Sequence, residues 1–192
     1  MTKSELRKIY AEIRRSLPTE VHADLSRDIA LRFFEHIDLS NIRTLHCFVS
    51  VKHAKEVESW LILQRIWSEF PDIRTFAPRV NETAGVIDPL PIGINTGLVE
   101  NKWRVPEPAK GDPIDPEAID LVIVPLLCYD ARGYRVGYGK GFYDKFLAVC
   151  RADCLKIGLS FFPPVDRIDD IDGHDMPLDL FITPGRAYTR RR

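Results

Sequence analysis

The chain has 192 residues, enough for one domain with a buried core, and we predict a single domain over residues 1–192. Hydrophobic residues make up 45% and charged residues 29%, which is the balance of an ordinary globular protein. The formal net charge of -1 gives no reason to expect a nucleic-acid partner.

No apolar stretch is as long as a membrane span, and the charged N-terminal segment lacks the apolar core of a signal peptide. The cysteines form no CxxC pair and have no histidines at zinc-finger spacing. They are Cys47, Cys128, Cys150 and Cys154. We therefore expect buried free thiols in a cytoplasmic protein without a membrane partner. We also expect a monomer or weak dimer.

Apolar residues recur at helical spacing within residues 3–16 and predict an amphipathic helix that Pro18 ends. Thr19 is expected to be the N-cap of a second helix that reaches Phe34. The short β-prone run at residues 44–49 predicts a strand.

Helical spacing returns at residues 56–70, and residues 73–77 predict a strand that Pro78 stops. Residues 78–116 are rich in proline, glycine and asparagine, which indicates loops with one or two short strands. The continuous apolar run at residues 120–125 is typical of a strand that is covered on both faces.

A glycine-rich turn follows this strand, and then a predicted helix over residues 141–150. Further strands are expected at residues 155–160 and 180–183. Strands that alternate with helices predict an α/β fold. We expect a three-layer sandwich with a mostly parallel central sheet and helices on both faces.

The glycine-rich turn at residues 133–141 is the most informative segment. Glycine allows positive φ and lets backbone N–H groups approach a ligand closely, and the turn leads into a helix N-terminus, which favours anions. Arg135 and Lys140 add two cations suited to phosphate. In an open α/β sheet, ligands bind at such a strand-to-helix crevice. The glycines concerned are Gly133, Gly137, Gly139 and Gly141.

Two well-known phosphate-binding motifs do not fit this spacing. A P-loop requires GxxxxGK followed by Ser or Thr, but Gly133 lies one residue too far from Gly139, and Gly141 follows Lys140. GxGxxG also fails, because the glycines alternate at 137, 139 and 141. A flexible surface loop or hairpin turn remains the alternative interpretation.

The segment RVGYGKGFYDKFL at residues 135–147 resembles the signature of the 5-formyltetrahydrofolate cyclo-ligase (methenyltetrahydrofolate synthetase) family. In the place where the family usually has a Gln, near the expected folate pocket, this chain has Phe162-Pro163-Pro164. Other family landmarks follow in order along nearly the whole chain: Lys3 and Arg7, Ser50 before Glu56, Pro78-Arg79, residues 103–108, and His174-Asp175-Met176.

The resemblance implies ring closure of 5-formyltetrahydrofolate to 5,10-methenyltetrahydrofolate, with ATP converted to ADP and phosphate. Transfer of the γ-phosphoryl group to the formyl oxygen would make that oxygen a leaving group, and such transfer depends on positioning and charge neutralisation. Arg135 and Lys140 are the implied catalytic residues. The implied ATP-binding residues are Lys3, Arg7, Arg135, Gly137, Gly139, Lys140, Gly141, Phe142 and Tyr143.

The resemblance also implies a folate site and a Mg²⁺ site. Magnesium prefers hard oxygen ligands, and Asp144 and Asp175 are the implied metal ligands. A carboxylate suits the donor edge of a pterin, and aromatic rings can stack on folate. The implied substrate-binding residues are Val49, Glu56, Trp103 and Tyr143.

Plainer interpretations remain for each group of residues. Lys3 and Arg7 also fit a solvated helix, and Trp103 and Tyr143 also fit core packing. Two rival functions use the same glycine segment. A sugar-phosphate isomerase or transferase on a related α/β fold would bind a phosphate monoester without ATP hydrolysis. A non-catalytic nucleotide-binding module would hold nucleotide as a regulatory signal.

Overall fold

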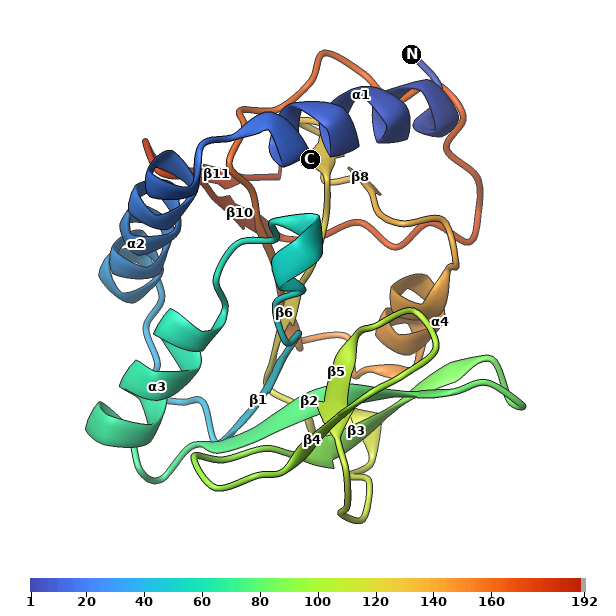
Figure 1. Cartoon of the computed structure of the whole chain (residues 1–192). Coiled ribbons are helices and arrows are strands. Elements are labelled where there is room, and N and C mark those ends of the chain that lie inside the picture. Colours follow the sequence, from blue (N-terminus) through green and yellow to red (C-terminus); the bar gives the residue numbers. More distant parts are fainter. Residues whose placement is uncertain (191–192) are drawn as a thin grey trace.

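A mixed, mostly parallel sheet forms the centre of the molecule, which is described here from a computed structural model of residues 1–190 (Figure 1). Arg191 and Arg192, the last residues of the predicted domain, lie outside the described residues. The seven-stranded sheet has the order β11-β10-β9-β6-β1-β2-β3. All neighbours from β10 to β2 are parallel, and β11 and β3 pair antiparallel at the two edges. The strands are β1 Thr44–Cys47, β2 Arg74–Asn81, β3 Val86–Pro91, β6 Leu121–Val124, β9 Leu155–Leu159, β10 Leu180–Ile182 and β11 Ala187–Thr189.

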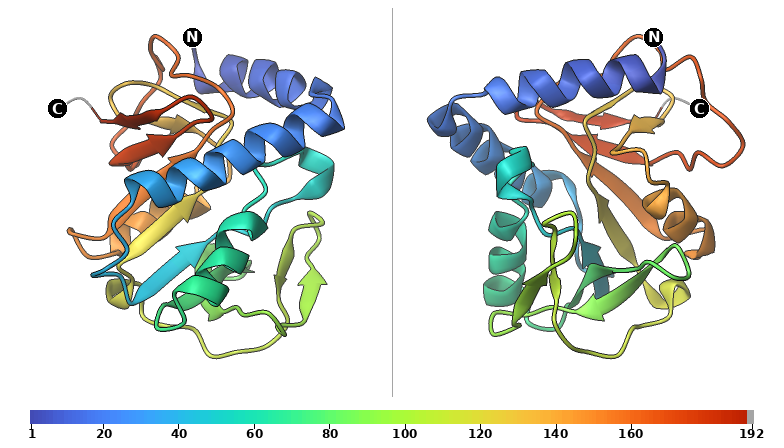
Figure 2. Two further views of the ribbon diagram at one scale, coloured as in Figure 1. Left: turned by 90° about the vertical axis from the view of Figure 1, so that its left-hand side faces the viewer. Right: turned by 45° about the vertical axis from the view of Figure 1, so that its right-hand side comes forward.

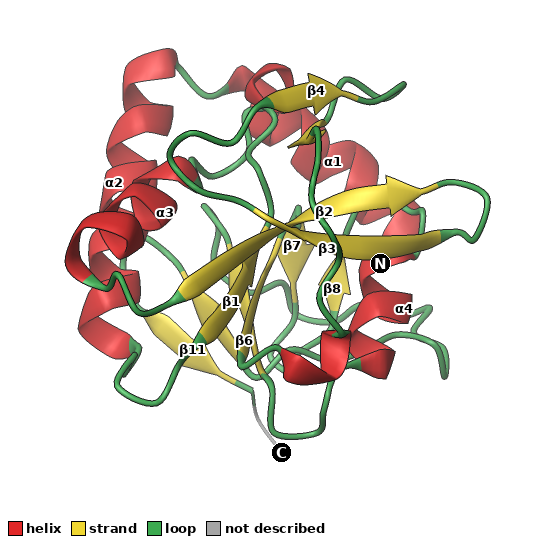
Figure 3. Cartoon of the chain, turned by 90° about the horizontal axis from the view of Figure 1, so that it is seen from below, coloured by secondary structure: helices red, strands yellow, loops and turns green. Residues whose placement is uncertain are grey.

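Helices cover both faces of this sheet, as predicted. Helices α2 (Thr19–His36) and α3 (Trp60–Glu69) lie on one side of the strands, and α4 (Phe142–Val149) lies on the other (Figures 2 and 3). Helix α1 (Lys3–Ser16) crosses one end of the sheet. The predicted three-layer α/β architecture is confirmed.

The central strand β6 shows why its apolar run is continuous. Leu121 and Ile123 belong to the core cluster that contains α2 and α3, whereas Val122 and Val124 belong to the cluster that contains α4. Alternate side chains point to opposite faces of a strand, so a sheet covered on both sides needs apolar residues at every position. Each such side chain contributes about 1.5–3 kcal/mol on burial.

Helix α1 begins at a capping box, in which the Thr2 hydroxyl accepts from Glu5 N and the Glu5 carboxylate accepts from Thr2 N. The prediction of Thr19 as the next N-cap is wrong, because Pro18 occupies that position and Thr19 is the first helical residue. Proline fixes φ near the value that the chain needs there and has no amide hydrogen to satisfy.

Helix α3 begins at Trp60 rather than at residue 56. The preceding segment forms a short 3₁₀ helix, η1 (Lys52–Ala54), after which Lys55 adopts a left-handed conformation with φ 46°. The Glu56 side chain accepts from Val51 N at 2.8 Å, and this turn keeps residue 56 out of the helix. Helical spacing alone could not detect this reversal.

Pro78 does not stop β2, contrary to the prediction. The strand continues through Pro78 to Asn81 and pairs antiparallel with β3. Pairing with β1 ends at Phe76, so β2 has only β3 as a sheet neighbour beyond that point. A residue without an amide hydrogen is tolerated at such an edge.

The segment predicted as loops with one or two strands contains three, β3 and the hairpin of β4 (Leu98–Glu100) and β5 (Pro106–Pro108). β7 (Cys128–Tyr129) and β8 (Arg135–Val136) pair antiparallel in a further hairpin, and these two short strands were not predicted. A further short 3₁₀ helix, η2 (Pro116–Ala118), precedes β6. No helix within residues 1–190 is long and apolar enough to cross a membrane.

Candidate active site

One large cleft lies where the glycine loop, the start of α1, the segment around η1, the β2–β5 region and residues 172–176 meet, and its volume is about 920 Å³. The structure brings every predicted site residue to the lining of this cleft. These residues are Lys3, Arg7, Val49, Glu56, Trp103, Arg135, Gly137, Gly139, Lys140, Gly141, Phe142, Tyr143, Asp144 and Asp175. Their individual roles remain predictions.

The glycine loop, residues 137–141, connects β8 to α4. Gly139 (φ 85°) and Gly141 (φ 69°) are left-handed, a conformation that other residues adopt at a cost. A Cβ atom on Gly139 would also lie 3.1 Å from Arg7 Cζ. The Arg7 guanidinium therefore packs directly on the loop, and its Nε donates to Gly137 O at 2.8 Å. Helix α1 and the loop thus form one unit, and Gly141 occupies the N-cap position of α4.

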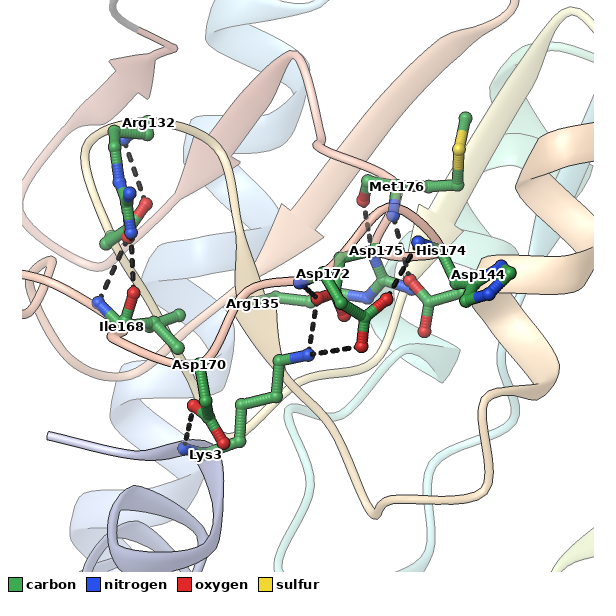
Figure 4. Close-up of polar contacts among 11 residues, drawn as sticks. Lys3, Arg132, Arg135, Asp144, Ile168, Asp170, Asp172, His174, Asp175 and Met176 are labelled. Carbon is green, nitrogen blue, oxygen red and sulfur yellow. Dashed lines mark hydrogen bonds and ion pairs between the residues drawn. The ribbon is translucent and has the colours of Figure 1, made fainter.

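Arg135 lies in β8 rather than in the glycine-rich turn with which the sequence analysis grouped it. It is 8% exposed, and burial lowers the pKa of its guanidinium, an effect that Asp144 opposes. One nitrogen donates to Asp144 Oδ1 at 2.9 Å and the other to Met176 O at 2.7 Å (Figure 4). Met176 N also donates to Asp144 Oδ1 at 3.1 Å. The carboxylate is therefore held from two sides.

Lys3 makes a similar contact with the other predicted metal ligand. Its ammonium group forms an ion pair with Asp175 Oδ2 and lies 3.9 Å from Asp172 Oδ2 (Figure 4). Asp172 N also donates to Asp175 Oδ2 at 2.8 Å. The same cation that was predicted to contact ATP thus touches a predicted metal ligand, so the two expected subsites adjoin.

Each of the two carboxylates has one oxygen held by protein donors. Within residues 1–190, the other oxygens, Asp144 Oδ2 and Asp175 Oδ1, accept no hydrogen bond from the protein. No group of three or more metal-binding side chains gathers in this part of the chain. Two oriented carboxylates with free oxygens fit Mg²⁺, which usually keeps several waters and needs only one or two protein carboxylates.

Glu56 is the predicted substrate acid, and it is 5% exposed. Its Oε2 accepts from Val51 N at 2.8 Å, and its Oε1 accepts from the Tyr138 hydroxyl. Burial raises the pKa of Glu56, while the Tyr138 hydrogen bond and the charge of Arg14 oppose that rise. The carboxyl group is therefore held in one orientation, but its hydrogen bonds only partly offset the cost of burying its charge.

Aromatic rings cover the glycine loop. Trp103 lies 5.9 Å from Phe142, between centroids, and Lys140 Nζ lies 5.9 Å from the Trp103 ring. Lys140 itself is exposed. Tyr143 is partly buried with its hydroxyl inside the protein, and burial raises the pKa of that hydroxyl, which has no hydrogen-bond partner among the described residues. These rings form an apolar wall beside the charged floor of the cleft.

Sequence reasoning missed Tyr138 and Arg14, which the structure connects to Glu56. Their only sequence signal was that Tyr138 lies between two loop glycines. Phe162, which was expected near the folate pocket, is not among the residues that line the cleft. Phe162 packs on Tyr10 of α1 at 5.3 Å between centroids, Phe161 packs on His22 at 5.2 Å, and neither lines the cleft.

Comparison of sequence and fold relates this chain to folate enzymes. A model of the 5-formyltetrahydrofolate cyclo-ligase family matches residues 1–184. The 5-formyltetrahydrofolate cyclo-ligase of Mus musculus is 25% identical over 190 residues, which cover 92% of each chain. The NMR structure of the Aquifex aeolicus 5,10-methenyltetrahydrofolate synthetase superposes with a TM-score of 0.83 at 25% identity and covers 100% of this chain and 94% of its own. The Mycoplasma pneumoniae synthetase shares the fold, with a TM-score of 0.76, 24% identity and coverage of 96% and 99%.

Proposed function

The chain belongs to the 5-formyltetrahydrofolate cyclo-ligase family, and we propose that its cleft closes the ring of 5-formyltetrahydrofolate with ATP, as a carbon–nitrogen ligase. The products are 5,10-methenyltetrahydrofolate, ADP and phosphate. The observation that carries this proposal is that a phosphate-type glycine loop and a buried, oriented carboxylate, Glu56, line the same cleft. A phosphate donor and a flat polar substrate can therefore meet there.

ATP lies with its phosphates on the glycine loop in this proposal. The left-handed glycines expose backbone N–H groups, and the N-terminus of α4 adds the favourable end of its dipole. Lys140 is free to reach the phosphates because it is exposed and has no carboxylate partner within residues 1–190. Arg7, fixed on the loop through Gly137 O, contributes a second positive charge.

The chemical step is transfer of the γ-phosphoryl group from ATP to the formyl oxygen of the folate. The bond between the γ-phosphorus and the bridging oxygen breaks, and ADP leaves. The formyl carbon, now attached to a phosphate leaving group, becomes iminium-like and is attacked by N10. Loss of phosphate and of the N10 proton then gives the methenyl product. The chain's task is to align the two substrates and to neutralise phosphate charge.

Asp144 and Asp175 are the residues that would hold Mg²⁺. A magnesium ion supplies charge neutralisation on the phosphate oxygens of ATP. Arg135 acts mainly through Asp144, since it fixes Oδ1 of that carboxylate and leaves Oδ2 for the metal. Lys3 has the corresponding relation to Asp175. Both cations therefore position acids as well as adding charge beside the nucleotide.

Glu56 accepts hydrogen bonds from the pterin edge of the folate in this proposal, and Val49, Trp103 and Tyr143 contribute apolar and aromatic walls. The folate then lies across the loop that holds the nucleotide, because the Tyr138 hydroxyl of that loop reaches Glu56. The short distance between the two subsites is what the phosphoryl transfer requires.

Substrate-dependent ADP release tests the proposal. With ATP and magnesium, the purified chain should release ADP only when 5-formyltetrahydrofolate is present. The amount of methenyl product, measured by its near-ultraviolet absorbance, should equal the amount of ADP. A sugar-phosphate isomerase or transferase would release no ADP with the folate. A nucleotide-binding module would bind ATP without either product. Either result with folded protein would overturn the proposed reaction.

We further propose a cytoplasmic, monomeric or weakly dimeric enzyme. The support is that Cys47, Cys128, Cys150 and Cys154 are all free thiols, as expected in a reducing compartment. Sedimentation of the purified chain measures the oligomeric state.

A further inference from the structure

Three side chains from distant parts of the sequence form a continuous polar chain at the edge of the cleft. Arg14 Nη2 donates to the Tyr138 hydroxyl at 2.5 Å, and the same hydroxyl donates to Glu56 Oε1. Arg14 belongs to the last turn of α1, Tyr138 to the glycine loop, and Glu56 to the turn after η1. The phenol therefore bridges a cation and a carboxylate that have no direct contact.

Burial makes this bridge energetically significant. Arg14 is 4% exposed and Glu56 is 5% exposed. The Tyr138 residue is 46% exposed, but its hydroxyl reaches inward, and burial together with the nearby Glu56 charge raises the pKa of that hydroxyl above its usual range. A buried charge without a partner is costly, so Arg14, Tyr138 and Glu56 each depend on the hydrogen bonds that link the three side chains.

The other contacts of Arg14 fix it to the protein rather than to a ligand. Its Nη1 donates to Leu126 O at 3.2 Å, just after β6, and its guanidinium carbon lies 5.5 Å from the centre of the Tyr138 ring. It does not line the cleft. Arg14 is thus a rigid support behind Tyr138, anchored at the end of the central strand.

We propose that Tyr138 is a positioning residue that couples the ATP loop to the folate site: held by Arg14, its hydroxyl orients Glu56, so folate affinity depends on the position of the loop. This inference rests on the proposed function of Glu56 as the folate-binding acid. Tyr138 lies between Gly137 and Gly139, so phosphates that order the loop also order the hydroxyl. Nucleotide binding then fixes the orientation of the Glu56 carboxylate that binds the folate.

The charges around Glu56 determine how the loss of this hydroxyl would appear with pH. The groups that face the Glu56 side chain are Tyr138, Arg14, His53 and the Tyr143 hydroxyl, together with Val51 N. His22 of α2 approaches from the backbone side, with its Nε2 at 2.7 Å from Glu56 O. The Tyr138 hydrogen bond lowers the pKa of Glu56 against the larger effect of burial. Without it the pKa rises further, so the carboxylate that binds folate is protonated at a higher pH.

Two variants and one control test the coupling. Tyr138→Phe removes only the hydroxyl, and Arg14→Met removes the supporting cation. Tyr134→Phe is the matched control, because Tyr134 lies in the neighbouring β7–β8 turn, packs on Arg132 and does not line the cleft. The probes are 5-formyltetrahydrofolate and a β,γ-imido analogue of ATP, with dissociation constants measured by calorimetry for each alone and for each in the presence of the other.

Nucleotide analogue should tighten folate binding in the unaltered chain, and Tyr138→Phe should remove that effect. The expected loss of folate affinity in the ternary complex is about ten- to a hundredfold, the range for a hydrogen bond to a charged group. Affinity for the analogue alone should change little. The folate KM should rise more than kcat falls, and the acid limb of kcat/KM for folate should move to higher pH. Tyr134→Phe should match the unaltered chain in every measurement.

A double-mutant cycle decides between coupling and independent damage. If Arg14 acts through Tyr138, the effects of Arg14→Met and Tyr138→Phe on folate affinity are not additive. Additive effects, retained coupling in Tyr138→Phe, or absence of coupling in the unaltered chain would each overturn the inference. Failure of the unaltered chain to form methenyl product would instead overturn the proposed function, so the two failures are distinguishable.

Discussion

A carboxylate lies near each end of the parallel strands of the central sheet: Asp120 is partly buried and Glu56 is buried. The two carboxylates differ in how many hydrogen bonds they accept from the protein. Asp120 lies at the amino ends of β1, β6 and β9, where Arg43 N, Thr44 N and the Thr44 hydroxyl donate to one of its oxygens and Arg151 donates to the other. Glu56, beyond the carboxyl end of β1, receives one donor on each oxygen.

The pKa values of the two groups differ accordingly. Burial raises the pKa of Glu56 above its ordinary range. Burial also opposes ionisation of Asp120, but the hydrogen bonds from Arg151, Arg43 and Thr44 outweigh it and lower the pKa. A saturated carboxylate stabilises the fold, whereas an undersaturated one keeps acceptor capacity for a ligand. The comparison predicts that stability and activity can be damaged separately at the two ends.

Arg135→Met should have the largest effect, because it is the one change expected to damage both properties. It leaves Asp144 without its buried partner, so the free energy of unfolding should fall by about 3 kcal/mol and turnover by about a hundredfold. Denaturant titration and steady-state turnover measure the two losses. Unchanged stability would show that the Arg135–Asp144 pair is not a structural part of the cleft.

Lys140→Met should affect activity alone. Lys140 is exposed, so unfolding should be unchanged, while loss of a charge-assisted phosphate contact should reduce turnover about ten- to a hundredfold. The assay is turnover at limiting ATP, with the thermal midpoint as the control for folding. Near-normal turnover would remove Lys140 from the catalytic residues.

Asp120→Asn should affect stability alone. The variant loses the charge that several donors share, so the free energy of unfolding should fall by about 2 kcal/mol, with KM and kcat retained. Because folding lowers the pKa of Asp120, its contribution is present above the ordinary carboxyl pKa and is lost as pH falls through the lowered value. The variant should therefore lack part of the acid-induced loss of stability. A loss of activity at full folding would contradict the separation of the two ends.

Asp144→Asn should raise the magnesium requirement. Loss of a residue that only hydrogen-bonds to a metal ligand already weakens metal binding about tenfold or more. Loss of charge on a ligand itself should weaken magnesium binding by at least as much. Excess magnesium should restore part of the turnover. A magnesium titration identical to that of the unaltered chain would move the metal site away from Asp144.

Among the changes in the cleft, Glu56→Gln should have the smallest effect on activity, and that effect should be selective for folate. The folate KM should rise about tenfold, in line with one lost charge-assisted hydrogen bond, while the affinity for ATP measured without folate stays unchanged. Because folding raises the pKa of Glu56, its ionisation costs stability as pH rises from the ordinary carboxyl pKa through the raised value. The variant should lack this decrease in stability with rising pH. Asp120 has the opposite effect, since its contribution to stability is lost as pH falls. An equal loss of affinity for ATP measured without folate would contradict the assignment.

The sequence predicted the fold where a pattern is local. The apolar run of β6 and the helical spacing of α1 gave the right elements, because period and burial follow from neighbouring residues. It failed at Pro78 and residue 56, where pairing with β3 and a hydrogen bond to Val51 N decided the structure. Those are tertiary facts that spacing does not contain.

The candidate site shows the same division. The glycines and cations within residues 135–144 predicted a phosphate-binding loop without help from the resemblance. The family resemblance was needed to predict roles for the distant residues Glu56 and Asp175. No pattern could show that Arg135 is buried against Asp144, or that Tyr138 joins Arg14 to Glu56 across long stretches of sequence. The effect of those contacts depends on burial and direction, which only the folded chain specifies.

The fate of the formyl oxygen tests the central claim most directly. 5-Formyltetrahydrofolate labelled with a heavy oxygen isotope in its formyl group is converted with unlabelled ATP, and the released phosphate is examined by mass spectrometry. Phosphoryl transfer to the formyl oxygen predicts one labelled oxygen in each phosphate, in amounts equal to the methenyl product and to ADP. Unlabelled phosphate alongside full product formation would show that ATP is cleaved without activation of the folate, and the proposed chemistry of this cleft would be wrong.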